Sequence, residues 1–125
     1  MKVETQEWVS KAEGDWQVAN REIQNDSPVW DVVSFLCQQC AEKYLKAFLE
    51  EYNIQFRKTH DLVLLHDSSG GLLPELDAHR VALAHLTVFG IAARYPGTEA
   101  DEPAATDALN TADTVRTVIR TKLGL

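Results

Sequence analysis

Two short stretches of the sequence bring together side chains that could bind an anion. His60 follows Thr59 at the expected start of a short helix, where free backbone N–H groups favour negative charge, and Lys58 precedes them. Arg94 and Tyr95 stand directly before a proline, which restricts the backbone, so the guanidinium there could bind a phosphate. Each stretch also has a structural interpretation. Thr59 would then cap the helix while His60 packs against a neighbour, and Arg94 with Tyr95 would anchor a loop to the bundle.

Two further candidate ligand-binding residues, Lys43 and Lys46, lie on a long helix. Gln39, Lys43 and Lys46 are three or four residues apart and therefore share one helical face, which we expect to be exposed and charged. Acidic residues are interleaved with them, so a solvated, ion-paired face is the structural alternative. The adjoining face is apolar and should pack in the core: Val33, Leu36, Cys37, Cys40, Tyr44, Ala47 and Phe48.

Neither the cysteines nor the histidines are spaced for redox or metal chemistry. Cys37 and Cys40 form a Cys-x-x-Cys pair, but both fall in the middle of a helix on its apolar face, so we expect buried, unreactive thiols. A zinc site needs further ligands at suitable spacing, and none is present. The four histidines are too far apart in helical phase to form one: His60, His66, His79 and His85. We therefore expect no metal and no other cofactor.

Length and composition indicate one globular domain over residues 1–125. The mass is 14.0 kDa, and 45% of the residues are hydrophobic and 25% charged. The net charge is -7, which repels phosphate backbones, so any contact with RNA has to be local. No apolar run reaches the roughly 20 residues that span a bilayer, and the N-terminus lacks the pattern of a secretory signal. We expect a cytoplasmic protein that does not enter the membrane.

Apolar periodicity predicts helices throughout the chain. Ser27 can cap the second helix and Pro28 fits its first turn, while Gly70 and Gly71 mark a flexible turn. No strand pattern competes with this interpretation. The expected fold is all-α, an up-and-down antiparallel bundle of four main helices plus a short helix. The expected helices cover about residues 5–25, 29–52, 60–66, 74–92 and 103–123.

Three sequence blocks resemble the HEPN family of small helical proteins. They are a QxxEKxxKA pattern at residues 39–47, KTHDL at 58–62 and RYPG at 94–97, and the resemblance extends from about Trp8 to Leu123. It implies the helical bundle predicted above. It also implies a binding module that forms a homodimer, partners a separate small nucleotidyltransferase and binds nucleotide, as in a toxin–antitoxin-like system. Lys43, Lys46, His60, Arg94 and Tyr95 would then be its ligand-binding residues.

The same resemblance leaves a second function open, a metal-independent ribonuclease toxin. Ribonucleases of the family use an arginine and a histidine with four to six residues between them, and Arg80 and His85, with four residues between them, have that spacing. His85 would act as the acid–base group and Arg80 would hold the phosphate of an RNA substrate. Five residues correspond to a helical rotation of about 500°, which places the two side chains apart on a regular helix. The structural alternative is one surface arginine and one half-buried histidine.

Overall fold

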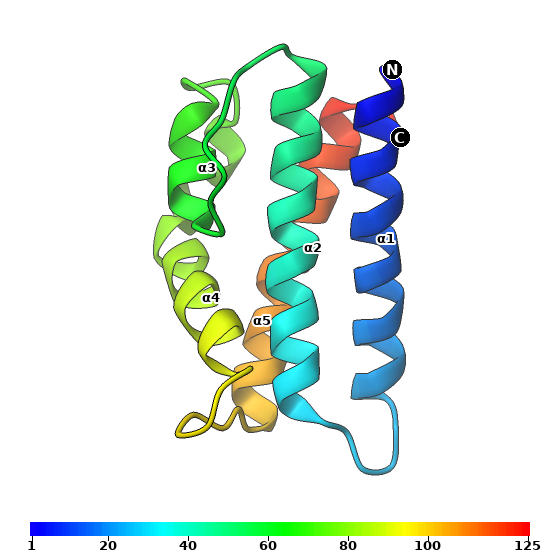
Figure 1. The fold of residues 1–125 in the computed structure, drawn as a ribbon, viewed down its shortest axis with the longest axis vertical. Helices are drawn as coiled ribbons and strands as arrows, with labels where there is room; N and C mark the ends of the chain where they lie inside the picture. Colours follow the sequence, from blue (N-terminus) through cyan, green and yellow to red (C-terminus); the bar gives the residue numbers. More distant parts are fainter.

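The computed structural model describes residues 1–125, and helices form all of its regular secondary structure. Figure 1 shows the four long helices running alternately down and up, with the two termini at the same end. The predicted all-α antiparallel bundle of four main helices and a short one is therefore confirmed. The elements in chain order are α1 (Val3–Ile23), α2 (Trp30–Glu51), α3 (Leu62–Ser68), the 3-10 helix η1 (Pro74–His79), α4 (Arg80–Ala92) and α5 (Glu102–Lys122).

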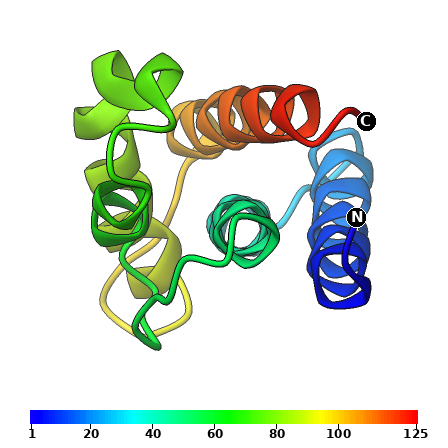
Figure 2. The same ribbon diagram turned by 90° about the horizontal axis from the view of Figure 1, so that it is seen from above.

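Helix α2 occupies the centre of the bundle. Viewed from above, it lies between α1 on one side and α3 with α4 on the other, and α5 covers a third side (Figure 2). The apolar face predicted for α2 is buried, including Cys37, Cys40, Tyr44 and Phe48. Further residues around the same helix are buried as well, because a central helix must be covered on most of its circumference.

The charged side of α2 is not displayed to solvent, contrary to the sequence prediction. Lys46 is only 8% exposed and Glu42 is also buried. The ammonium group of Lys46 lies 5.5 Å from the ring centre of Trp8, which belongs to α1. A pattern on one helix reports which residues share a face, but neighbouring helices and loops decide whether that face is covered.

The short helix α3 begins later than predicted, at Leu62 rather than His60. Its N-cap is Asp61, whose Oδ1 accepts hydrogen bonds from the backbone N–H groups of Val63 and Leu64. The hydroxyl of Thr59, which we expected to cap the helix, instead accepts from the backbone N–H of Asp61 at 3.1 Å. A carboxylate at the N-cap also interacts favourably with the helix dipole, which explains why Asp61 takes this place.

The start of α2 also differs from the prediction. Val29 is its N-cap, with no side-chain capping bond, so Ser27 and Pro28 lie outside the helix. The backbone N–H of Val29 donates to Glu22 of α1 at 3.0 Å, and this bond across the turn replaces the expected cap. Helices α1 and α5 begin and end within two residues of their predicted bounds, as is usual for helix termini.

Gly90 allows α4 to approach α2 closely. A Cβ atom at this position would lie 2.4 Å from Cβ of Gln38 and 3.2 Å from the carbonyl oxygen of Ser34. Only glycine fits this contact. The segment 74–92, predicted as one helix, is divided into η1 and α4, and α4 is the part that packs on α2 through Gly90.

Candidate functional site

Lys43 and Lys46 both form ion pairs within the protein. Nζ of Lys43 lies 2.6 Å from Oδ2 of Asp15 on α1, and Nζ of Lys46 lies 3.0 Å from Oε2 of Glu42. Both lysine side chains are largely covered. Their charges are therefore compensated where they lie, as in the structural alternative that the sequence left open.

Glu42 is the centre of a polar network that joins two of the three sequence blocks. Its Oε1 accepts hydrogen bonds from Nδ1 of His60 at 2.7 Å and from Nε2 of Gln38 at 3.2 Å. The same amide of Gln38 donates to the backbone carbonyl of His60 at 2.9 Å. These bonds fix the segment between α2 and α3 against the centre of α2. His60 remains 68% exposed at its side chain, so its ring reaches solvent beyond this network.

Arg94 is held in place without an ion-pair partner. Its guanidinium carbon lies 4.5 Å from the ring centre of Phe35 on α2, within the range of a cation–π interaction. The loop that follows is fixed to the start of α2, because Oδ1 of Asp31 accepts from the backbone N–H of Ala100 at 2.6 Å. Tyr95 is 61% exposed. The RYPG stretch thus forms an anchored corner, as expected, while its arginine keeps an uncompensated charge.

Arg80 and His85, the pair expected for the ribonuclease, make different contacts. Nη1 of Arg80 lies 2.7 Å from Oδ1 of Asp67 and donates to Nδ1 of His66 at 2.9 Å. The ring of His85 lies 4.3 Å from that of Phe89, one turn further along α4. Within one chain the structure therefore does not bring the two side chains together.

His66 is a polar partner that sequence reasoning missed. It is buried, and its Nε2 donates to the backbone carbonyl of Leu73 at 2.9 Å, so its Nδ1 is free to accept from Arg80. This contact ties α3 to the start of α4. The only signal in the sequence was the position of His66 at the end of the expected short helix, just before the glycine turn. No spacing rule links a residue on one side of that turn to Arg80 on the other, so this contact could not be predicted.

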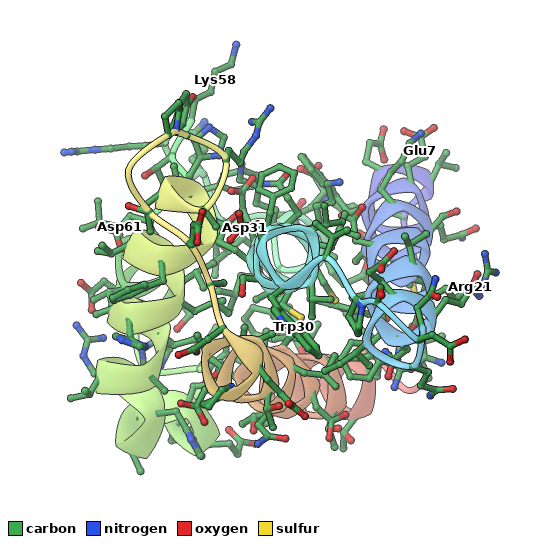
Figure 3. All side chains as sticks on the ribbon, turned by 90° about the horizontal axis from the view of Figure 1, so that it is seen from below. Glu7, Arg21, Trp30, Asp31, Lys58 and Asp61 are labelled. Atoms are coloured by element: carbon green, nitrogen blue, oxygen red, sulfur yellow. The ribbon has the colours of Figure 1, made fainter.

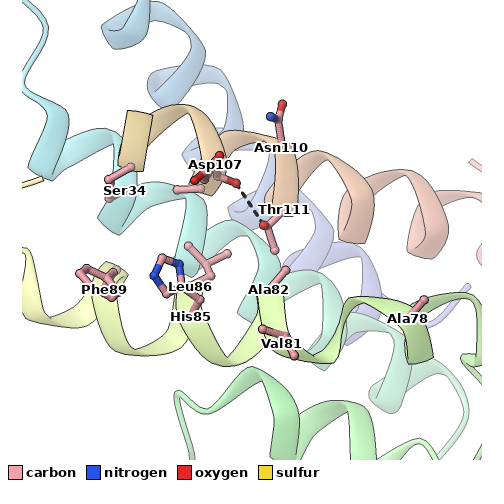
Figure 4. Close-up of a pocket in the computed structure, with 13 residues that line it drawn as sticks. Ser34, Ala78, Val81, Ala82, His85, Leu86, Phe89, Asp107, Asn110 and Thr111 are labelled. Carbon is pink, nitrogen blue, oxygen red and sulfur yellow. Dashed lines mark hydrogen bonds between the residues drawn. The ribbon is translucent and has the colours of Figure 1, made fainter. Parts of the chain in front are cut away.

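A groove of about 460 Å³ lies between α4 and α5 (Figure 4). Its α4 wall is mainly apolar, and its α5 wall carries polar side chains, among them Asp107 and Asn110. The hydroxyl of Ser34, another residue of the lining, is buried and has no hydrogen-bond partner. This groove could not be predicted from the sequence, because its walls come from four elements, α2, η1, α4 and α5. The lining residues are Ser34, Ala78, Val81, Ala82, His85, Leu86, Phe89, Gly90, Ala104, Asp107, Ala108, Asn110 and Thr111.

The α4 wall of this groove continues onto an uncovered, mainly apolar face of the helix, and Val81 and His85 belong to both. Val81 is 85% exposed and Val88 is 63% exposed, and Ala84 and His85 are exposed between them. These four residues follow the spacing i, i+3, i+4 and i+7, so they form one stripe along the helix, which we call the α4 ridge. A contiguous stripe of this kind usually marks an interaction site in a soluble domain.

A second charged cluster joins α1, α2 and α5. Glu13 accepts a hydrogen bond from the hydroxyl of Tyr44, and it forms ion pairs with Arg116 at 3.0 Å and Arg120 at 2.8 Å. Burial alone would raise the pKa of Glu13, but hydrogen bonds from Tyr44 and Arg116 and the two positive charges lower it below its ordinary value. All members of this cluster satisfy one another, so its role is structural.

The cysteines are buried as expected. Both are free thiols, and burial raises the pKa of Cys37 to about 12 and that of Cys40 still further. No group of three or more His, Cys, Asp or Glu side chains is arranged to hold a metal ion. None of the helices combines the length and the apolar character needed to cross a bilayer.

Comparison with known proteins gives one match. A family model described as HEPN domain matches residues 5–122, which is nearly the whole chain. No curated protein and no solved structure matches the chain.

Proposed function

The chain belongs to the HEPN family, and on that premise we propose that it is a homodimeric binding module that binds nucleotide and partners a small nucleotidyltransferase. The observation that carries the proposal is the α4 ridge beside the α4–α5 groove. One chain thus presents both an apolar projection and a hollow of matching character. The nucleotidyltransferase partner rests on the family resemblance alone.

The ridge and the groove are suited to a twofold arrangement. In a symmetric dimer the same surface serves both subunits, so the ridge of one copy can enter the groove of the other and the reverse. Small residues such as Ala104 and Ala108 line the groove, and small side chains let helices pack closely. A ridge with i, i+3, i+4 and i+7 spacing is the form in which a helix enters a groove.

The polar groups of the two surfaces are complementary as well. His85 belongs to the ridge, and Asp107 stands on the opposite wall of the groove (Figure 4). Neither side chain has a hydrogen-bonding partner within the chain, and both are exposed. In the twofold arrangement the imidazole of one copy faces the carboxylate of the other, which favours this pairing over an all-apolar partner.

The oligomeric state tests this proposal. We expect wild-type protein to be a dimer at micromolar concentration by native mass spectrometry and light scattering, and Val88→Asp to be monomeric. Removing an exposed valine from an interface loses about 1.5 kcal/mol or more per site, and the added carboxylate would be buried. The loss weakens dimerisation by more than about tenfold. Val18→Asp, on the exposed side of α1, is the matched control and should remain dimeric.

A monomeric wild-type protein, or a dimer that Val88→Asp leaves intact, would contradict the proposed interface. Native mass spectrometry of protein purified gently from its own host also reads the composition of the complex. A second, unlike subunit supports the nucleotidyltransferase partner. Recovery of the homodimer without any other subunit would count against the nucleotidyltransferase partner.

One observation favours the ribonuclease as a second candidate. The His85 ring is exposed in the groove and forms no hydrogen bond, so it is free to transfer a proton. Arg80, however, is held by Asp67 and His66. If His85 is catalytic, expression should arrest growth and His85→Ala should relieve the arrest. Normal growth with intact cellular RNA would rule this candidate out.

A further inference from the structure

We propose that Arg94 and His60, with Lys58 beside them, bind the phosphate groups of a nucleoside triphosphate across one face of α2. This inference deepens the nucleotide-binding part of the proposed function and rests on it. It assigns a place and a ligand class to that binding, and it is independent of the α4 ridge. Figure 3 shows Lys58 and the loop after α4 on the same side of α2.

Most cationic side chains of this acidic protein are already engaged. Seven of the twelve lysines and arginines pair with a carboxylate or bond to another side chain or the backbone: Lys2, Lys43, Lys46, Arg80, Arg116, Arg120 and Lys122. The other five have no carboxylate partner. Three of these five, Arg57, Lys58 and Arg94, are exposed on the two loops that carry the KTHDL and RYPG blocks. Uncompensated positive charge is therefore concentrated on these loops.

The two loops reach the same face of α2. Arg94 lies over Phe35, and His60 is bonded to Glu42, seven residues later on that helix. Seven residues turn an α-helix through almost two full turns and advance it by about 10 Å. Arg94 and His60 therefore stand over one face, roughly 10 Å apart along the axis. A single extended anionic ligand can contact both.

Both groups are fixed in position before any ligand arrives. The guanidinium carbon of Arg94 lies over the Phe35 ring, and no carboxylate occupies its N–H groups, so they are available for two parallel bonds to a phosphate. Glu42 accepts from Nδ1 of His60, so the other ring nitrogen faces solvent. Fixed groups lose little conformational entropy on binding, which favours affinity.

Three carboxylates near these groups are themselves occupied, whereas Glu99, five residues after Arg94, is exposed and has no partner. Glu42 is paired with Lys46, Asp61 caps α3, and Asp31 accepts from the backbone N–H of Ala100. Each of these interactions draws negative charge toward the interior or toward backbone donors. An incoming phosphate therefore meets the cations of the loops with less opposition than the net charge of the protein implies.

Tyr95 supplies a contact for the base. Its ring is 61% exposed, it follows Arg94 directly, and it stacks on no other ring in the chain. An exposed aromatic side chain beside a phosphate-binding arginine is the combination that stacks a nucleobase without strong preference among bases. We therefore expect ATP and GTP to bind with similar affinity and inorganic tripolyphosphate to bind more weakly.

The test is isothermal titration calorimetry of the full chain with ATP, GTP, tripolyphosphate and adenosine. Arg94→Gln and His60→Gln should each weaken ATP binding by about tenfold or more, since each loses a charge-assisted bond. His60→Gln keeps a donor for Glu42, so folding should be preserved. Arg21→Gln removes an exposed, unpaired arginine on α1 and should leave binding unchanged.

The proposal is wrong if about 1 mM ATP gives no heat of binding, or if wild type and Arg94→Gln bind ATP with equal affinity. It is also wrong if Arg21→Gln loses as much ATP affinity as Arg94→Gln, because that would indicate general charge attraction only. The oligomeric state of each variant is read by native mass spectrometry in the same preparations. A dimer that binds no nucleotide refutes this inference and leaves the dimer interface standing. A monomer that binds ATP through Arg94 supports this inference and refutes the proposed dimer interface.

Discussion

Gly90→Ala tests whether the close contact between α4 and α2 holds the bundle together. The new Cβ would lie 2.4 Å from Cβ of Gln38. Carbon atoms in contact prefer about 3.5–4.0 Å, so one helix has to move by about 1 Å. The contacted atom is next to the backbone of a buried residue and cannot turn away as the end of a flexible side chain could.

The expected magnitude is a net loss of about 2 kcal/mol. Overpacking a core position costs about 1–3 kcal/mol, and this contact belongs at the upper end because two backbones must separate. Alanine returns up to about 1 kcal/mol through its higher helix propensity. For a domain of this size the melting temperature should fall by roughly 8 °C.

Gly14→Ala is the matched control for this prediction. Gly14 lies in the exposed part of α1, and an added Cβ there would meet nothing within 4 Å. The same substitution should therefore raise the melting temperature by about 4 °C. Both variants and the wild type are compared by calorimetry at one protein concentration, because the proposed dimerisation would make stability concentration-dependent. If Gly90→Ala melts at or above the wild-type temperature, the inferred contact is wrong.

Three further predictions concern the Glu42–Lys46 ion pair, the carboxylate of Glu13 and the two cysteines. Glu42→Ala leaves the buried ammonium of Lys46 without a partner and should destabilise the fold by about 3–5 kcal/mol in urea titrations; a change below about 1 kcal/mol would mean that the pair is solvated. The pKa of Glu13 is lower in the folded protein than in the unfolded chain, so as the pH falls the unfolded chain takes up this proton first. The stabilisation that Glu13 contributes is therefore complete above its ordinary pKa of 4.5 and is lost as the pH falls through its pKa in the folded protein. Glu13→Gln should therefore narrow the difference in melting temperature between about pH 6 and about pH 3, and an unchanged difference would remove Glu13 as its source. Native Cys37 and Cys40 should resist iodoacetamide at about pH 8 until urea exposes them, as mass spectrometry would show, and fast labelling of the native protein would contradict their burial.

The helices themselves could be predicted because local rules govern them. The apolar repeat of α2 identified its buried face, and Asp101 with Pro103 starts α5 close to the expected residue. Errors arose where two local signals competed. Thr59 and Asp61 can both cap a helix, and Asp61 takes that place while Gln38 of α2 bonds to the carbonyl of His60 between them.

The candidate site was predictable in part. His60, Arg94 and Tyr95 were identified from loop chemistry, and they remain exposed. Lys43 and Lys46 were identified from helical spacing, but their ion pairs with Asp15 and Glu42 engage them. Asp15 is on another helix, and Glu42 also bonds to His60 of the segment that follows α2, so neither outcome could be read from α2 alone.

The sequence by itself determined the helical class, the approximate bounds of the helices and the family, because hydrophobic period, caps and short motifs are written in neighbouring residues. Only the tertiary structure decided which charged side chains are compensated and which remain free, where the α4–α5 groove lies, and that Arg80 meets His66. The physical reason is how far apart along the chain the interacting residues lie. Secondary structure depends on contacts a few residues apart, whereas burial and charge pairing depend on groups that only the packing of separate helices brings within a few ångströms.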